Sequence, residues 1–378
     1  MSLKPIVALD LGSTKVACAI ALPHERSAGF ELLGTSLSAY PVLFESWLSD
    51  PLIVGRTIEQ ALEATAVRGD FHRAVVTVSH PWLTSERVRV SVTLGDEPVP
   101  VRAHDLERLQ MLALDQALGM DREPLLIERL GCAGNGFDGV RDPRGLSASR
   151  LFGTFQIVTM PMAARRVVVQ AVESAGLEVA KLTYTLPAVL ASLADEETQR
   201  KRVLLVDVGG LSSHVGLFVD GVLQASTAIA AGGLTLAMDI ARSLGVTMEQ
   251  AVTWSLEGTA CRKTEVRTMI EQRRASLRQG IGQVLQEQPQ PDVALVTGRG
   301  ALADGFVEWV ERTTGIHTSL CRSSRTSRFG DLSRQVGLTP VLGILEHLTV
   351  GTNGSVVRSP HLINRLIDQT RTILTEYF

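Results

Sequence analysis

A short turn near the start of the chain combines residue types that bind phosphate. It reads Asp10-Leu-Gly12-Ser13-Thr14-Lys15 and separates two apolar runs. Glycine lets the backbone approach an anion, hydroxyl and amide groups donate hydrogen bonds to it, and lysine adds a positive charge. The carboxylate of Asp10 suits Mg²⁺ held through water, because Mg²⁺ keeps much of its hydration shell. Residues 10–15, the first turn, are therefore a candidate site for a nucleotide phosphate.

A second turn of this kind follows about 200 residues later, with Asp207, Gly209, Gly210 and Ser212 between two further apolar runs. A third, glycine-rich turn spans residues 297–301. One such motif alone is equally compatible with a hairpin that closes two buried strands, its hydroxyls capping the turn. The presence of three shifts the interpretation to nucleotide binding.

Strands on either side must position these turns. Apolar, β-branched runs flank both, Asp220-Gly221 is typical of a tight hairpin, and helical periodicity follows over residues 57–67 and 234–244. Two such units predict an internal duplication, with two α/β lobes and a site between them.

Composition narrows the class of protein. The chain has 378 residues, a formal charge of −3, 45% hydrophobic and 4% aromatic residues, with five lysines against thirty-two arginines. This length predicts more than one core, and the balanced charge argues against a nucleic-acid partner. The four cysteines lie far apart and no long apolar run occurs, so we expect a soluble, cytosolic chain.

Residues 79–162 interrupt the two-lobe plan. A strand over 87–94, a helix over 103–118, a turn-rich stretch over 131–145 and a strand over 151–160 predict an inserted α+β subdomain. Further along, we expect a long polar helix over 262–288, a buried strand over 293–300, a short helix near 338–348 and a linker over 350–360. The predicted division is a first lobe (1–78, with 163–196 and 329–349), the insertion (79–162), a second lobe (197–328), and a linker with a C-terminal helix (350–378).

This constellation resembles the actin, hexokinase and heat-shock-chaperone ATPase superfamily, and within it the bacterial cell-division protein FtsA. The similarity covers the first turn, the stretch Gly139–Leu151 at the end of the insertion, and the glycine pair Gly232-Gly233. It implies an actin-like (ribonuclease H-like, duplicated) fold with a nucleotide cleft, ATP and Mg²⁺ as ligands, metal-holding Asp10 and Asp207, and Asp207 as the catalytic candidate. The nucleotide-binding residues that it implies are Asp10, Gly12, Ser13, Thr14, Lys15, Asp207, Gly209, Gly210, Ser212, Gly232, Gly233, Gly298, Arg299 and Gly300.

The second turn departs from the family pattern. Leu211 stands where a third glycine is usual, and its Cβ is expected to obstruct close backbone approach. His214 replaces an aspartate, and Arg299 interrupts the third turn. Seven residues separate Gly258 from Val266, so the outer part of the second lobe is shortened. We therefore expect ATP to bind and its hydrolysis to be weak or absent.

The C-terminal segment is amphipathic. Its apolar positions trace one helical face and predict a membrane-surface helix; the alternative is a helix packed on the protein's own core. The apolar residues are Leu362, Ile363, Leu366, Ile367, Ile373, Leu374, Tyr377 and Phe378.

The resemblance implies a scaffold that self-associates into filaments, binds the C-terminal peptide of FtsZ, and tethers the FtsZ ring to the cytoplasmic face of the inner membrane at the division site. The alternatives are a pilus or secretion assembly adaptor like PilM, a nucleotide-free pseudo-ATPase scaffold, and a small-molecule kinase, for which we find no catalytic carboxylate. The arginine clusters at 262–278 and 322–334 are interpreted as solvated faces or protomer contacts, and His80 and His214 as turn or core residues.

Overall fold

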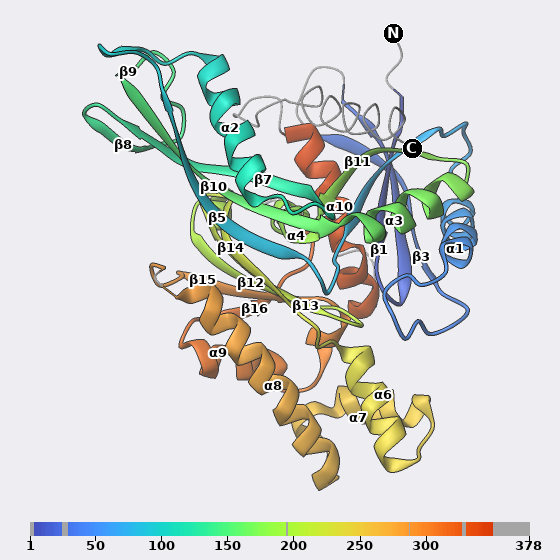
Figure 1. Ribbon diagram of the computed structural model, residues 1–378. Helices are drawn as coiled ribbons and strands as arrows, with labels where there is room; N and C mark the ends of the chain where they lie inside the picture. The colour runs from blue at the N-terminus through green and yellow to red at the C-terminus, as the bar shows by residue number, and fades with distance from the viewer. Residues whose placement is uncertain (1–3, 25–28, 194–195, 287, 327–329, 351–378) are drawn as a thin grey trace.

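The computed structural model describes residues 4–24, 29–193, 196–286, 288–326 and 330–350. Figure 1 shows three parts: a first lobe around β1 and β3, a second lobe around β12 and β13, and an inserted subdomain beside both. Helices α6 and α7 extend from the second lobe, away from the first.

The two lobes contain five-stranded sheets of the same topology. The first sheet has the strand order β11-β4-β1-β2-β3. The second has the order β14-β13-β12-β15-β16, which is equivalent to the first when it is read from the opposite edge. In each, the first three strands form an antiparallel meander and the last two run parallel to the first strand. The predicted duplication is therefore present in the fold.

The strands of the first sheet are β1 (Ile6–Leu11), β2 (Lys15–Pro23), β3 (Phe30–Ala39), β4 (Arg73–Val78) and β11 (Glu178–Tyr184). Those of the second are β12 (Arg202–Val208), β13 (Ser213–Val219), β14 (Val222–Ile229), β15 (Val293–Thr297) and β16 (Thr318–Leu320). Asp220 and Gly221, both at positive φ, form the expected hairpin between β13 and β14.

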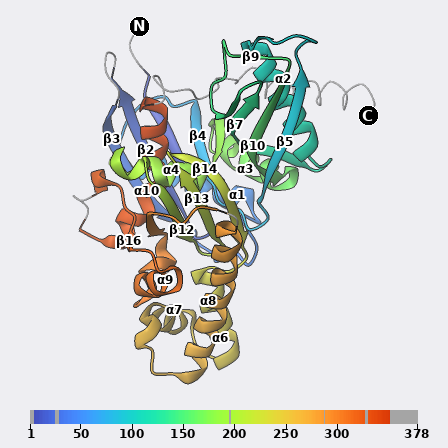
Figure 2. The same ribbon diagram turned by 90° about the vertical axis from the view of Figure 1, so that its left-hand side faces the viewer.

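Helices cover the sheets on both faces. The first sheet packs against α1 (Pro51–Ala64) and α3 (Met162–Ser174) on one side, and α10 (Leu332–Val350) and α4 (Thr185–Ala191) on the other. The second sheet packs against α8 (Thr264–Leu285) and α9 (Phe306–Thr314). Helices α6 (Gly233–Leu244) and α7 (Met248–Glu257) form their own cluster with α8, and Glu196–Gln199 forms the short α5. Figure 2 shows α6 to α8 gathered at the far end of the second lobe.

The insertion consists of an antiparallel sheet covered by one helix. Its elements are β5 (Thr84–Thr93), β6 (Val99–Pro100), α2 (Ala103–Ala117), β7 (Arg122–Gly134), β8 (Phe137–Val140), β9 (Ser147–Ala148) and β10 (Arg150–Pro161), with sheet order β5-β10-β7-β8. The stretch expected to be turn-rich, 131–145, contains two turns, but its first part also pairs as the β7–β8 hairpin. Gly136, at positive φ, lies in the turn of this hairpin.

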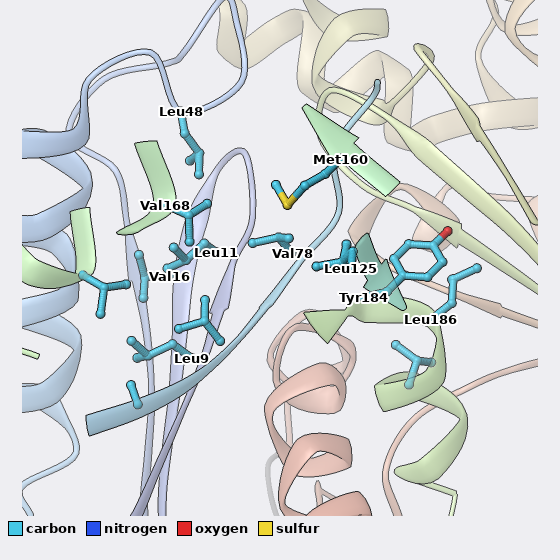
Figure 3. Packing of buried hydrophobic residues seen from close by; sticks show 14 of the residues in the cluster. Leu9, Leu11, Val16, Leu48, Val78, Leu125, Met160, Val168, Tyr184 and Leu186 are labelled. Atoms are coloured by element: carbon cyan, nitrogen blue, oxygen red, sulfur yellow. The ribbon is translucent and has the colours of Figure 1, made fainter. Parts of the chain in front are cut away.

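One apolar core continues across the lobes. Leu9, Leu11 and Val78 of the first lobe belong to the same buried cluster as Leu205 and Phe218 of the second. Figure 3 shows Leu125 and Met160 of the insertion beside this cluster, with Tyr184 at its edge and the tyrosine hydroxyl turned away from the aliphatic side chains. The three parts are thus packed together through buried side chains.

Two smaller expectations need correction. The helix expected near 338–348 begins earlier, at Leu332, and its last residue, Val350, belongs to the helix and not to a linker. The remainder of the expected linker and the C-terminal segment lie outside the described residues. Within the described ranges, no helix has the length and apolar character needed to cross a membrane.

Candidate nucleotide site between the lobes

The first and second turns occupy equivalent places in the two sheets. Each connects the first two strands of its meander, at the carboxyl end of the parallel strands. Asp10 pairs with Ala17 and Thr77 on the neighbouring strands, and Asp207 pairs with His214 and Thr297. The carboxyl ends of parallel strands are where α/β proteins place ligands.

The first turn holds a buried ion pair. The backbone N–H of Gly12 donates to the Lys15 carbonyl at 3.1 Å, which closes the turn. The Lys15 ammonium lies 3.0 Å from Asp10 Oδ2, with 11% and 9% of the two side chains exposed. Because little water reaches the pair, the charges are screened weakly. A cation is therefore fixed in this turn.

The second turn closes in the same way but contains no cation of its own. The Gly209 N–H donates to the Ser212 carbonyl at 3.0 Å. Burial and, to a smaller extent, the charge of Asp10 raise the pKa of Asp207 to about 7, although the charge of Lys15 lowers it. The carboxyl groups of the two turns thus lie close enough to interact across the lobe boundary, with Lys15 near both.

The two turns contact each other directly. The backbone N–H of Leu211 donates to Ser13 Oγ at 3.0 Å, and both atoms are buried. A Cβ atom at Gly210 would lie 2.6 Å from Ser13 Oγ, so only glycine allows the lobes to approach this closely here. Leu211, expected to obstruct backbone approach, contributes its amide to this interlobe contact.

The glycine pair before α6 packs behind the second turn. The N–H groups of Gly233 and Leu234 donate to the carbonyls of Gly209 and Gly210, each at 2.9 Å. A Cβ at Gly232 would lie 2.2 Å from the Gly210 oxygen. The first amides of α6, which could bind an anion, are therefore paired with the second turn.

The third turn joins the same cluster. A Cβ at Gly300 would lie 2.4 Å from Val208 Cγ1, and Gly298 has a φ of +83°. Arg299, between these glycines, is exposed, so its side chain does not crowd the second turn. The structure brings together all the glycine turns that the sequence singled out.

Sequence reasoning missed the role of His214 in this site. Its Nε2 lies 3.1 Å from Ser212 Oγ and its Nδ1 lies 3.2 Å from the Tyr184 hydroxyl. Burial, followed by the proximity of His80, lowers the pKa of His214 to about 3, so the ring is neutral. The interpretation of His80 and His214 as core residues was correct, since each is nearly inaccessible. The sequence did contain one indication of this role, because His214 stands where the family usually has an aspartate.

A cavity of about 70 Å³ lies between α6, α7 and α8, beside the glycine turns. Its lining includes Gly232, Gly233, Ser255, Arg273, Arg274 and Phe306. The interpretation of the 262–278 arginines as solvated was wrong for Arg274, which is buried, ion-paired with Glu271 at 2.8 Å, and 5.5 Å from the Trp309 ring centre. Apolar residues on α8 alternate irregularly with the arginines. The sequence therefore did not reveal which arginine faces inward.

The described residues contain no group of three His, Cys, Asp or Glu side chains that could hold a metal ion. Asp10 and Asp207 are two carboxylates, which suits a Mg²⁺ ion that also takes water and phosphate oxygens. The predicted membrane-binding residues all lie outside the described residues, and they are Leu362, Ile363, Leu366, Ile367, Ile373, Leu374, Tyr377 and Phe378.

Two lobes of one topology, with facing turns between them, define the actin-like class of proteins, as the sequence predicted. Solved structures share this fold. The PilM protein of a PilM–PilN type IV pilus biogenesis complex matches with a TM-score of 0.67 at 16% identity, covering 92% of this chain and 98% of that one. MreB 5 of Spiroplasma citri bound to AMPPNP matches with a TM-score of 0.51 at 10% identity, covering 93% and 98%.

The insertion and the sequence relatives specify the class further. Residues 82–159 match the family described as the SHS2 domain inserted in FTSA. The cell-division protein FtsA of Pseudomonas aeruginosa is 27% identical over 64% of this chain and 58% of its own length, and FtsA of Agrobacterium fabrum is 28% identical over 64% and 57%. The aligned region thus spans less than two thirds of these relatives. The chain therefore has an actin-like fold, and its sequence is similar to those of FtsA proteins.

Proposed function

We propose that this chain is an actin-like cell-division scaffold that binds ATP with Mg²⁺ between its two lobes. The observation that carries the proposal is the meeting of the first and second turns in a chain with an FtsA-type insertion. Lysine and hydroxyl groups converge on this place, and together they form a donor set suited to phosphate oxygens.

The residues fit the ligands by charge as well as by chemistry. Lys15 would meet a phosphate, with Gly12, Ser13 and Thr14 on one side and Gly209, Gly210 and Ser212 on the other. Asp10 and Asp207 would hold Mg²⁺, whose charge offsets that of the phosphates when bound. Because Ser13 and Leu211 bond each other, nucleotide entry requires this contact to break and the lobes to separate there.

We propose that hydrolysis is weak or absent. Asp207 is the candidate general base, and its pKa of about 7 is suitable for that role. At position 214, however, a neutral histidine that is already paired with Ser212 and Tyr184 replaces the expected carboxylate. The related alternative is a scaffold that works without nucleotide, in which the direct contact between the turns persists.

Equilibrium binding of fluorescent AMPPNP, with and without Mg²⁺, tests nucleotide binding. We expect Mg²⁺-dependent binding that Lys15→Gln weakens at least about tenfold, because a charged hydrogen bond to phosphate is lost, whereas Lys4→Gln, an exposed change, leaves it intact. Equal binding by Lys15→Gln would contradict the site. A turnover assay follows, and robust hydrolysis abolished by Asp207→Ala would contradict a weak ATPase.

The proposed partners are further copies of this chain, the C-terminal peptide of FtsZ, and the cytoplasmic face of the inner membrane at the division site. The alternative of a PilM-like assembly adaptor is supported by the shared fold. Pull-down with an FtsZ C-terminal peptide separates the two, since an adaptor of the second kind would not retain it. Truncation at Gly351 tests the membrane helix, because the shortened chain should no longer sediment with liposomes.

A further inference from the structure

Strand β5 of the insertion presents arginines on its open face. Successive side chains of a strand point to opposite faces of the sheet. Helix α2 packs on the face that contains Val88 and Val92. Arg87 and Arg89 therefore lie on the other face, and both residues are exposed.

A third guanidinium group extends this line of charge. Arg150 belongs to the neighbouring strand β10, where it pairs with Thr93. Its Nε and Nη2 donate to Ser91 Oγ at 3.1 and 2.8 Å, so its charge lies beside position 91 of β5. Positions two apart on a strand are separated by roughly 7 Å, which makes a regular line of three cations. We term Arg87, Arg89 and Arg150 the arginine row.

Neighbouring groups hold the arginine row in place. The guanidinium carbons of Arg89 and Arg150 lie 5.3 and 5.2 Å from the centre of the Phe152 ring, which is within the range of cation–π attraction. Arg87 donates to the Gln224 carbonyl on β14 at 3.0 Å. Because these side chains are already positioned, they would lose less conformational freedom when a ligand binds.

The arginine row lacks carboxylate partners. Among the residues that the structure describes, no acidic side chain forms an ion pair with any of the three arginines. Glu86, the one acidic residue of β5, lies on the opposite face of the strand. Arginines elsewhere do pair, for example Arg165 with Glu123 at 2.6 Å. A fixed, uncompensated line of positive charge indicates an anionic partner.

Strand β5 also has a free edge. It stands at the end of the sheet order and, within the described ranges, pairs with β10 alone. Figure 2 shows it at the outer side of the insertion. The outward N–H and C=O groups of such an edge can pair with another extended segment. The free edge and the arginine row thus belong to the same strand.

We propose that β5 docks an acidic, extended segment of a partner protein, in which carboxylates occupy alternate positions. A strand added to β5 would lie about 4.8 Å away, with its alternate side chains opposite the arginine row. The planar guanidinium fork matches the geometry of a carboxylate. No described strand of this chain carries carboxylates at alternate positions, so the partner is a different protein. The site does not depend on nucleotide binding.

The same observations favour a peptide over a nucleic acid. Two guanidinium groups already lie over the Phe152 ring, which leaves its face less available for stacking of a base. The whole chain has a formal charge of −3, which gives no long-range attraction to a polyanion. A few carboxylates at strand spacing match the local charge more closely.

Fluorescence anisotropy of a short labelled peptide of alternating glutamate and threonine, mixed with the full chain, tests the site. We expect saturable binding that added salt weakens. Arg89→Gln and Arg150→Gln should each weaken binding at least about tenfold, because a charged hydrogen bond is lost. Arg68→Gln, which changes an exposed arginine of the first lobe, is the matched control and should bind normally.

A second peptide tests the spacing. It has the same composition, but its glutamates follow one another, so that every second carboxylate would point away from the arginine row. We expect it to bind more weakly than the alternating peptide. Equal binding of the two peptides would contradict recognition by an added strand.

Hydrogen exchange locates the bound peptide. Amides of β5 should exchange more slowly when the alternating peptide is present, whereas those of β8, at the opposite edge of the same sheet, should not change. Absence of binding, or equal binding by Arg89→Gln, would overturn the proposal and would mean that the arginines only shield the edge from pairing. Tighter binding of single-stranded oligothymidine, or of phosphatidylglycerol vesicles, that Arg89→Gln abolishes would also overturn it.

Discussion

The first and second turns have the same length and the same place in the fold, yet they differ in chemistry. Counting from the aspartate, each turn has a glycine two residues later, whose N–H donates to the carbonyl five residues after the aspartate. Equivalent positions are Asp10 and Asp207, Gly12 and Gly209, and Lys15 and Ser212. The two turns therefore share the same backbone hydrogen bond, but the residue at the fifth position after the aspartate differs, being Lys15 in the first turn and Ser212 in the second.

This difference assigns the two turns different tasks. The first contains the cation, and its carboxylate is paired directly with it. The second contributes the hydroxyl of Ser212, which pairs with a neutral histidine, and its carboxyl has a raised pKa. A phosphate bound between them would receive charge from one lobe and directed hydrogen bonds from the other.

Removal of the cation should have the largest effect on stability. In Lys15→Gln, Asp10 and Asp207 face each other with little solvent and without the ammonium. Breaking one partner of a buried ion pair costs about 3–5 kcal/mol. We expect a loss of that order in the free energy of unfolding at pH 8, measured by urea denaturation.

The loss in Lys15→Gln should shrink at pH 5, because protonation of Asp207, whose pKa is raised to about 7, removes the repulsion between the two carboxyl groups. Lys4→Gln, which changes an exposed lysine, should leave stability unchanged. A loss that is equal at both pH values would show that the ammonium acts through packing and not through charge.

Asp207→Asn should have the opposite sign. The pKa of Asp207 is about 7 in the folded chain and 3.8 as its ordinary value, so the folded state retains the proton more strongly. Stability therefore falls as pH rises from about 4 through 7. Asn removes this dependence, and at about 1.4 kcal/mol per pKa unit we expect a gain of roughly 2–4 kcal/mol at pH 8 and little change at pH 4.

The measurement for Asp207→Asn is urea denaturation across that pH range. Asp292→Asn provides a contrast, because the Arg202 partner lowers the pKa of Asp292 to about 2, so its loss should not stabilise the chain at pH 8. Destabilisation of Asp207→Asn at pH 8 would mean that the carboxylate has a stabilising partner in the folded state.

The fold and the turns could be predicted because their signals are local. Apolar runs that end in Asp-x-Gly specify a strand and a tight turn, and their repetition reveals the duplication. The contact between Ser13 and Leu211 could not be predicted in this way, since it joins residues 198 apart and depends on how the lobes pack. Leu211 looked like an obstruction because a sequence shows its side chain and not the amide that makes the contact.

The contact of His214 with the other lobe was missed for a similar reason. His214 was recognised as a substitution, but one of its partners, Tyr184, comes from the first lobe. Likewise, Arg274 is one of several arginines on a polar helix, and only the packing of α8 on Trp309 shows that it is buried. Such positions depend on tertiary contacts that have no period in the sequence.

The backbone of the second turn should tolerate less change than that of the first. A Cβ at Gly209 would lie 2.8 Å from the Ser212 carbonyl oxygen, whereas one at Gly12 would lie an ordinary 3.4 Å from the Lys15 oxygen. Gly209→Ala should therefore cost about 1–3 kcal/mol, as overpacking does, and Gly12→Ala should be nearly neutral. Urea denaturation of both variants checks this, and equal costs would show that both turns relax alike.

The smallest stability effect should come from the contact between the turns. Ser13→Ala leaves the buried Leu211 N–H without its acceptor, at a cost of about 1 kcal/mol or somewhat more. Ser46→Ala, in an exposed loop, is the matched control and should be neutral.

Hydrogen exchange gives the sharper measurement for Ser13→Ala, because the Leu211 amide should exchange faster while amides within β12 and β13 retain their protection. Such a local change would mean that the lobes meet through this bond and that a ligand can separate them there. Unchanged protection of Leu211 would instead mean that the apolar core shared by both lobes, and not this hydrogen bond, prevents the lobes from separating. Nucleotide entry would then require movement of whole lobes, and the chemical difference between the turns would affect binding only after that movement.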